Sequence, residues 1–141
     1  MQIRITRTHP DVELPTYQTT GSVAFDIAAI EDATIAPKSA AKIPTGLIIA
    51  TPEGFALLVA ARSSLFWKKG LILTNGVGIV DQDFCGPNDE IKLSLWNPTD
   101  APVIITKGER LCQGLFVPIE RAEWLEGPAE GPSRGGFGST G

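Results

Sequence analysis

The chain has 141 residues, 43% of them hydrophobic and 20% charged, as in one globular domain with enough core to fold without disulfides or a structural metal. Sixteen acidic and twelve basic residues give a net charge of −4, the opposite of the balance expected for a sequence-independent nucleic-acid binder. No apolar run approaches the ~20 residues of a membrane span, the N-terminus lacks a signal-peptide core, and Cys85 and Cys112 are too few for a disulfide framework or a zinc site. We therefore expect a reduced, cytoplasmic domain without nucleic-acid or membrane partners.

Eleven prolines and fifteen glycines divide the sequence into short segments, which argues against long helices. Residues 90–97 alternate polar and apolar side chains, the period of a half-buried strand. One short helix is expected over 63–70, with Ser63 or Ser64 as N-cap and Gly70 beyond its end. The apolar runs predict strands at 3–6, 24–29, 33–37, 41–50, 55–61, 71–74, 76–81, 90–97, 102–106 and 109–118. Short strands at this spacing predict an all-β sandwich, jelly roll or barrel.

The C-terminal segment has a different composition. Six of the last seventeen residues are Gly and two are Pro, which is typical of a disordered terminus. Phe137, set among glycines with Arg134 three residues earlier, instead indicates a flexible arm that orders over a ligand. We expect a β-domain over 1–125 and this arm over 126–141.

Residues 75–86 form the stretch most indicative of chemistry. Asp81 and Asp83 flank one residue, so an extended chain points both carboxylates to the same side. Asp83 is expected to cap the turn before Gly86. Asp81 directly follows an apolar strand, where a buried carboxylate is costly unless it is hydrogen-bonded or has a chemical role. Asp81 is therefore the stronger candidate for a functional group.

Two further stretches carry polar side chains at strand ends. Arg62, Ser63 and Ser64 lie between an apolar strand and the short helix, where hydroxyls, backbone N–H groups and a guanidinium suit an anion. Arg110 and Gln113 lie at a turn-to-strand junction. Taken alone, each stretch is as well explained by an N-cap, a surface arginine and a structural glutamine.

These three stretches, together with GSVAFDIAA at 21–29 and RGGFGSTG at 134–141, occur in the order of the five motifs of the trimeric dUTPase family. The chain resembles this family from LPTY at 14–17 to Gly141. The resemblance implies a distorted jelly-roll or β-clip sandwich that hydrolyses dUTP to dUMP and pyrophosphate with Mg²⁺. This reaction keeps uracil out of DNA and supplies dUMP for thymidylate synthesis. The resemblance also implies a homotrimer whose active sites use residues of all three subunits, with the arm exchanged between neighbours.

The resemblance gives roles to individual residues of the second and third motifs. Arg62, Ser63 and Ser64 would hold the triphosphate. Asn75 would bind the uracil edge, and Asp81 would activate the attacking water. The third motif's aromatic ring, here Phe84, would pack under the deoxyribose.

The other motifs supply the metal contact and the remaining substrate contacts. Asp26 would reach the substrate's magnesium through water, Gln113 would contact the α-phosphate, and Phe137 would stack on uracil. The remaining substrate-binding residues implied by the resemblance are Gly78, Ile79, Val80, Lys92, Arg134, Gly138 and Ser139.

The chain departs from the family pattern at three places. Phe84 stands where the family usually has Tyr, yet a phenyl ring can still pack on deoxyribose and exclude a 2′-hydroxyl. Residues 87–89, Pro-Asn-Asp, look like an insertion beside the uracil-binding hairpin, and they weaken the alignment of Lys92 as a backbone contact. Arg134 lies nearer to Phe137 than is usual in the fifth motif.

Two alternative functions remain at this point. A dCTP deaminase has a similar fold and an RSSL-like motif, but its catalytic glutamate would fall on Ser94 of this sequence. A catalytically silent nucleotide-binding β-sandwich would not need Asp26, Asp81 and Gln113 together. Both alternatives are therefore less favoured than dUTP hydrolysis.

Overall fold

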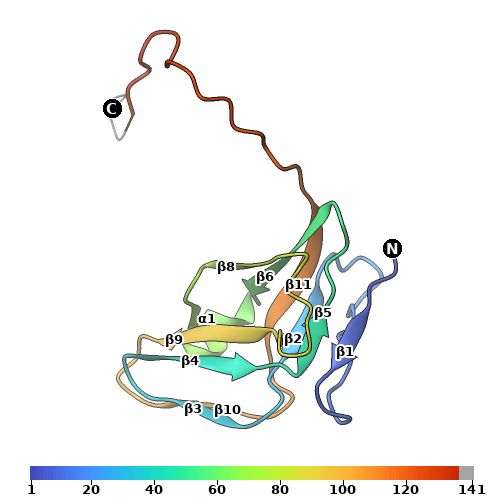
Figure 1. The fold of residues 1–141 in the computed structure, drawn as a ribbon. Coiled ribbons are helices and arrows are strands. Elements are labelled where there is room, and N and C mark those ends of the chain that lie inside the picture. The colour runs from blue at the N-terminus through green and yellow to red at the C-terminus, as the bar shows by residue number, and fades with distance from the viewer. Residues whose placement is uncertain (137–141) are drawn as a thin grey trace.

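The structure, a computed structural model, describes residues 1–136 and is built almost entirely of strands (Figure 1). The strands are β1 (Ile5–Arg7), β2 (Phe25–Ala28), β3 (Ala33–Ile35), β4 (Ser39–Pro44), β5 (Leu47–Ile49), β6 (Phe55–Ala61), β7 (Ile72–Leu73), β8 (Val77–Val80), β9 (Lys92–Asn97), β10 (Val103–Ile105) and β11 (Arg110–Pro118). One short helix, α1 (Ser64–Lys69), joins β6 to β7. The predicted all-β class is confirmed.

Two sheets position the functional residues. The first has the strand order β2-β11-β6-β8 and the second the order β4-β9-β7, with antiparallel pairing throughout. Two further pairs, β1 with β5 and β10 with β3, complete the body. Fully buried aliphatic side chains from both sheets, including Ile27, Leu57, Leu93 and Leu95, form one core. Removing these side chains from water is the main source of stability.

The run at 41–50, expected as one strand, is divided at Thr45 and Gly46 into β4 and β5. Gly46 has φ 71°, and a Cβ there would lie 2.4 Å from Cγ2 of Val12. Only glycine fits this backbone. The buried Thr45 hydroxyl donates to the Ile91 carbonyl at 2.6 Å and accepts from the Leu47 N–H at 3.2 Å, which stabilises the break.

The expected helix at 63–70 is present as α1. Leu65 anchors it in the core, and Gly70 ends it with φ 69° while its N–H donates to the Phe66 carbonyl at 2.7 Å. Ser63 is the N-cap residue, but its side chain makes no capping hydrogen bond. The hydroxyl at the start of α1 is therefore not used to hold the helix.

The chain beyond β11 leaves the body. The Ile119 N–H still donates to the Gly54 carbonyl at 2.9 Å, after which the chain runs away from the sheets (Figure 1). Trp124 and Leu125 on this segment are 94% and 97% exposed. Across the described residues, no helix is long and apolar enough to cross a membrane.

Candidate active site

A cluster of paired charges lies where β2, β6 and β11 meet. Strand β11 runs between β2 and β6, and its register places Gln113 opposite both Asp26 and Ala60. Asp26 accepts from Arg62 Nε at 2.9 Å through one oxygen and from Arg110 Nη1 at 3.1 Å through the other. The Asp26 side chain is only 11% exposed, whereas the two arginines are 30% and 47% exposed. One shielded carboxylate therefore positions two guanidinium groups that still reach solvent.

Further hydrogen bonds fix the geometry of this cluster. Arg62 also donates from Nη1 to the Arg110 carbonyl at 3.2 Å, and Gln113 donates from Nε2 to the Ala61 carbonyl at 3.2 Å. A cavity of about 320 Å³ beside the cluster is lined by the cations Arg62, Lys68, Lys69 and Arg110, together with Ser64 and Glu109. Arginine and lysine at this density favour a phosphate-bearing ligand.

A second cavity, of about 390 Å³, lies between β8 and β9. Seven of the predicted site residues line it: Asn75, Gly78, Ile79, Val80, Asp81, Phe84 and Lys92. The structure therefore brings together the third-motif residues and Lys92, despite the intervening Pro87–Asp89 segment.

The backbone of this cavity is open to a ligand. Strand β8 pairs on one side with β6 and forms the edge of its sheet. Strand β7 and the following Thr74 cover β9 from Ser94 to Trp96 and leave Lys92 and Leu93 uncovered on that side. Strand edges present N–H and C=O groups that can pair with an added partner. Gly78 lies in this edge, and a Cβ there would come within 3.3 Å of the Asn75 amide nitrogen. The cavity therefore presents backbone donors and acceptors to a bound ligand.

The connection from β8 to β9 closes one end of this cavity. The Phe84 N–H donates to the Asp81 carbonyl at 3.3 Å, and Gln82 Nε2 donates to the Phe55 carbonyl at 3.1 Å. The expected cap by Asp83 is wrong: Asp89 Oδ2 accepts from the Gly86 N–H at 2.7 Å. Asp89 takes this place because the turn from Gly86 to Asp89 brings its carboxylate back to the Gly86 N–H. Asp81 itself is exposed, so its carboxylate does not have the cost of burial that its place after an apolar strand suggested.

The basic cluster and the β8–β9 cavity lie far apart within one chain. Gln113 is opposite Ala60, which is opposite Val77, and Asp81 lies four residues beyond Val77. Four residues span about 13 Å along a strand and two strand spacings about 10 Å, which gives a separation of about 16 Å. Asp81 and Gln113 of one chain cannot contact the same phosphorus atom.

The cysteines are both free, and they differ in exposure. Cys112 precedes Gln113 in β11, and burial raises the pKa of its thiol to about 12. A thiol with so high a pKa stays protonated near neutral pH, and it does not act as a nucleophile. Within the described part of the chain, no three His, Cys, Asp or Glu side chains lie close enough together to hold a metal ion.

Some predicted residues lie outside these two sites. Ser63 is exposed at the start of α1, and Arg134 is exposed on the C-terminal segment. Phe137, Gly138 and Ser139 lie outside the described residues.

Conversely, the structure adds residues that sequence reasoning had not assigned: Arg110 at the basic cluster, and Lys42, Asn88 and Ser94 at the β8–β9 cavity. The pairing of Arg110 with Asp26 depends on the bulge between Arg110 and Cys112, which has no local sequence signal.

Comparison with known proteins decides the family. The family model described as dUTPase matches residues 10–141. This chain belongs to the dUTPase family. The deoxyuridine 5′-triphosphate nucleotidohydrolase of Hydrogenobaculum sp. is 37% identical over 145 residues, covering 100% of this chain and 99% of the relative.

Solved dUTPase structures agree with this assignment. The crystal structure of the Streptococcus mutans dUTPase superposes with a TM-score of 0.79 at 30% identity, covering 88% of this chain and 100% of that one. The dUTPase of Staphylococcus bacteriophage 80alpha with dUPNHPP gives a TM-score of 0.85 at 23% identity, covering 99% and 98%, and supports the fold. The predicted jelly-roll sandwich is confirmed, and so is the enzyme class, a dUTP diphosphatase.

Proposed function

We propose that this dUTPase hydrolyses dUTP in the cytoplasm, at active sites assembled between the copies of a homotrimer. The observation that carries the proposal is the register of β11, β6 and β8. It places the backbones of Asp81 and Gln113 about 16 Å apart. A base-binding cavity and a phosphate-binding cluster that cannot meet in one chain can meet across a subunit interface. A heterologous contact repeated by rotation closes a ring, and we propose that this ring has three copies.

Uracil would enter the cavity between β8 and β9. Its O2, N3–H and O4 need donors and acceptors in a fixed order, which the Asn75 amide and the edges of β8 and of β9 at Lys92 supply. Gly78, Ile79 and Val80 provide backbone groups on one side. A site that hydrogen-bonds its substrate rejects a mismatched base, because polar groups then remain unpaired. Phe84 would lie against the deoxyribose and exclude a 2′-hydroxyl.

The triphosphate would bind the basic cluster of a neighbouring copy. Arg62 and the hydroxyls of Ser63 and Ser64 would hold phosphate oxygens, and Gln113 would contact the α-phosphate. The pairing of Arg62 and Arg110 with Asp26 keeps both guanidinium groups aligned before substrate arrives. This preorganisation reduces the cost of ordering long side chains on binding.

Magnesium fits this donor set. Mg²⁺ keeps several waters and is commonly held by one or two carboxylates together with substrate phosphates. Asp26 is the carboxylate that pairs with Arg62 and Arg110, and each of its oxygens can accept a further hydrogen bond, so it would contact the ion through water. Bound there, the ion would neutralise charge that develops on the phosphate oxygens.

Asp81 would act as the general base. Its carboxylate would take a proton from a water molecule while the water oxygen bonds to the α-phosphorus. The bond between this phosphorus and the oxygen bridging to the β-phosphate breaks, releasing pyrophosphate and leaving dUMP. Positioning of the water molecule and of the α-phosphorus supplies most of the rate. The 126–141 arm would complete the site, with Phe137 on uracil and Arg134, Gly138 and Ser139 at the phosphates.

Deamination is not favoured by the residue at the corresponding position. Ser94 has a hydroxyl in place of a carboxylate, and the Thr74 hydroxyl donates to it at 2.7 Å. It has no basic group to move protons during attack on a cytosine ring.

A nucleotide panel tests the function. The purified protein should release pyrophosphate from dUTP with Mg²⁺, with much lower kcat/KM for UTP, dCTP and dTTP, and light scattering should give the mass of three chains. Ammonia release from dCTP, or no turnover of any nucleotide, would contradict the proposal.

A further inference from the structure

We propose that Asn88 is a specificity-determining residue that hydrogen-bonds the 3′-hydroxyl of the bound nucleotide. The proposal rests on the proposed function, because it places the deoxyribose beside Phe84. Asn88 is in the inserted Pro87–Asp89 segment, for which the substrate contacts above supply no role. It nevertheless lines the 390 Å³ cavity together with Asp81 and Phe84.

The turn that holds Asn88 is closed on both sides. The Gly86 N–H donates to Asp89 Oδ2 at 2.7 Å, and the Asp89 N–H donates back to the Gly86 carbonyl at 3.1 Å. Pro87 fixes its own φ within this short turn. These constraints hold the backbone of Asn88 at the cavity wall, so little backbone freedom remains to be lost when a ligand binds.

The chemistry of the loop end of the cavity favours a hydroxyl. Three polar side chains that line the cavity, Asp81, Asn88 and Glu90, come from the connection between β8 and β9. The others, Lys42, Asn75, Lys92 and Ser94, come from elsewhere in the chain. Ionised Asp81 and Glu90 only accept hydrogen bonds, and Glu90 Oε1 already accepts from the Gly46 N–H at 2.7 Å. The Asn88 amide both donates and accepts. Among these three side chains it alone can donate to the oxygen of a sugar hydroxyl.

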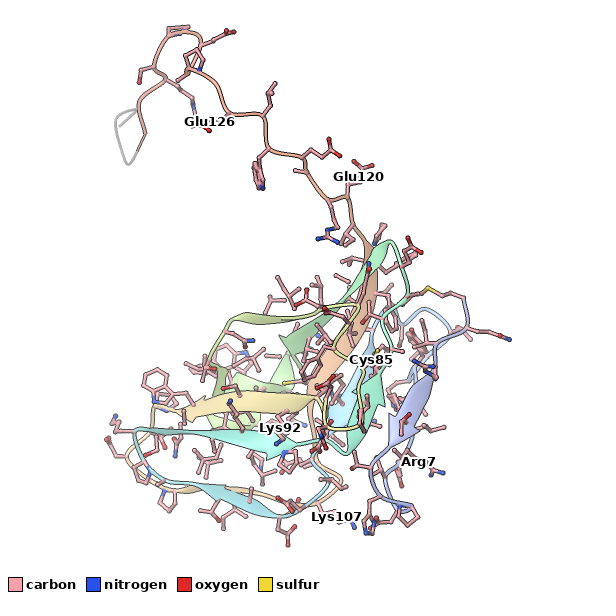
Figure 2. All side chains as sticks on the ribbon, in the orientation of Figure 1. Arg7, Cys85, Lys92, Lys107, Glu120 and Glu126 are labelled. Atoms are coloured by element: carbon pink, nitrogen blue, oxygen red, sulfur yellow. The ribbon has the colours of Figure 1, made fainter. Side chains whose placement is uncertain are left out.

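Figure 2 shows how the connection between β8 and β9 lies relative to the start of β9. The connection labelled at Cys85 folds back toward the first residue of β9, labelled at Lys92, so the loop closes the end of the cavity. Because Asp81 and Phe84 stand on the same connection, a sugar packed on Phe84 presents its hydroxyl to this loop. The 3′-hydroxyl is the ring hydroxyl that dUTP carries.

A substrate-by-variant cycle tests the proposal. Wild-type enzyme, Asn88→Ala and the control Gln2→Ala are compared for kcat/KM with dUTP and with 2′,3′-dideoxyuridine triphosphate. Dissociation constants for the α,β-imido analogues with and without the 3′-hydroxyl are measured in parallel. Asn88→Ala should weaken use of dUTP about 3- to 10-fold, the range of one neutral hydrogen bond, and leave use of the dideoxy nucleotide unchanged. Gln2→Ala, which removes an exposed amide outside the cavity wall, should change neither.

The outcomes separate this proposal from the proposed function. Equal losses for both nucleotides in Asn88→Ala would assign Asn88 to the loop structure and overturn the proposal, as would no loss for either. Absence of dUTP turnover in the wild type would instead contradict the proposed function. If the dideoxy nucleotide is turned over too slowly to measure, the same comparison of the two dissociation constants decides.

Discussion

The basic cluster and the β8–β9 cavity hold their polar groups in different ways. In the cluster, side chains provide the polar groups: Asp26 is shielded and pairs with two arginines that would otherwise repel each other. In the cavity, the backbone edges of β8 and β9 are the main polar surface, and side chains from the connecting loop close one end. The cluster thus provides positive charge for a polyanion, and the cavity provides a fixed arrangement of backbone groups for a base.

This difference separates binding strength from selectivity. Guanidinium and ammonium groups bind any triphosphate, whatever base it carries. Backbone edges in fixed register distinguish one base from another, because each mismatch leaves a polar group unpaired. Variants in the two regions should therefore fail in different ways.

The largest loss is expected from the cavity's carboxylate. Asp81→Asn keeps the shape of the side chain but cannot take a proton, so kcat should fall on the order of 10²–10⁴-fold. Affinity for α,β-imido-dUTP, measured by calorimetry, should be nearly unchanged. The neighbouring Asp83→Asn serves as the matched control. More than a third of the wild-type kcat in Asp81→Asn would remove Asp81 from this role.

A loss in binding rather than in chemistry is expected from the basic cluster. Arg62→Ala should weaken α,β-imido-dUTP binding about 10- to 150-fold, the range of a charge-assisted hydrogen bond. Affinity for deoxyuridine, which has no phosphate, should not change. Arg4→Ala, an exposed arginine elsewhere, controls for charge. If Arg62→Ala weakened deoxyuridine equally, the division between the two regions would fail.

Removing the arm tests whether the two regions suffice without it. A chain ending at Gly131 should fold and assemble normally, because the described part of the arm adds nothing to the core. Its kcat/KM should fall about tenfold or more, because water is no longer excluded from the site. Circular dichroism and light scattering check the fold and the assembly. Hydrolysis at the full-length rate would make the arm a solvated terminus only.

The smallest change is expected at the sugar. Phe84→Ala should reduce the preference for dUTP over UTP about 5-fold or more, since an unpaired hydroxyl against the ring costs about 1–3 kcal/mol. The ratio of the two kcat/KM values measures this directly. An unchanged ratio would show that Phe84 does not exclude the 2′-hydroxyl.

The sequence predicted the elements whose signals are local. Strand β6 lies at 55–61 as expected, and α1 lies within 63–70 because Leu65 and Gly70 define its anchor and its end. The break at Gly46 was missed, because it depends on Val12, which lies 34 residues earlier in the chain. A close approach between distant segments leaves no periodic pattern.

The site was predictable in its residues and not in its arrangement. The resemblance identified Asp26, Arg62 and Gln113, and the fold places them together. The partnership of Asp26 with Arg110 requires the β2–β11 register and its bulge, and the role of Asp89 requires the geometry of the inserted turn. The separation of Asp81 from Gln113 likewise emerges only when three strands are paired.

Subunit complementation tests that separation most directly. Asp81→Asn, which should lack turnover, and Arg62→Ala, which should bind dUTP weakly, are unfolded together in equal amounts and refolded. The mixture is assayed at a dUTP concentration far below the KM of Arg62→Ala, where each variant alone has little activity. If a site takes Asp81 from one copy and Arg62 from another, about a quarter of the sites in randomly mixed trimers contain both native residues. The mixture should then recover up to about a quarter of the wild-type activity, and a mixture of Asp81→Asn with itself should recover none. Absence of recovery, with mixed trimers verified by mass, would contradict an active site shared between copies.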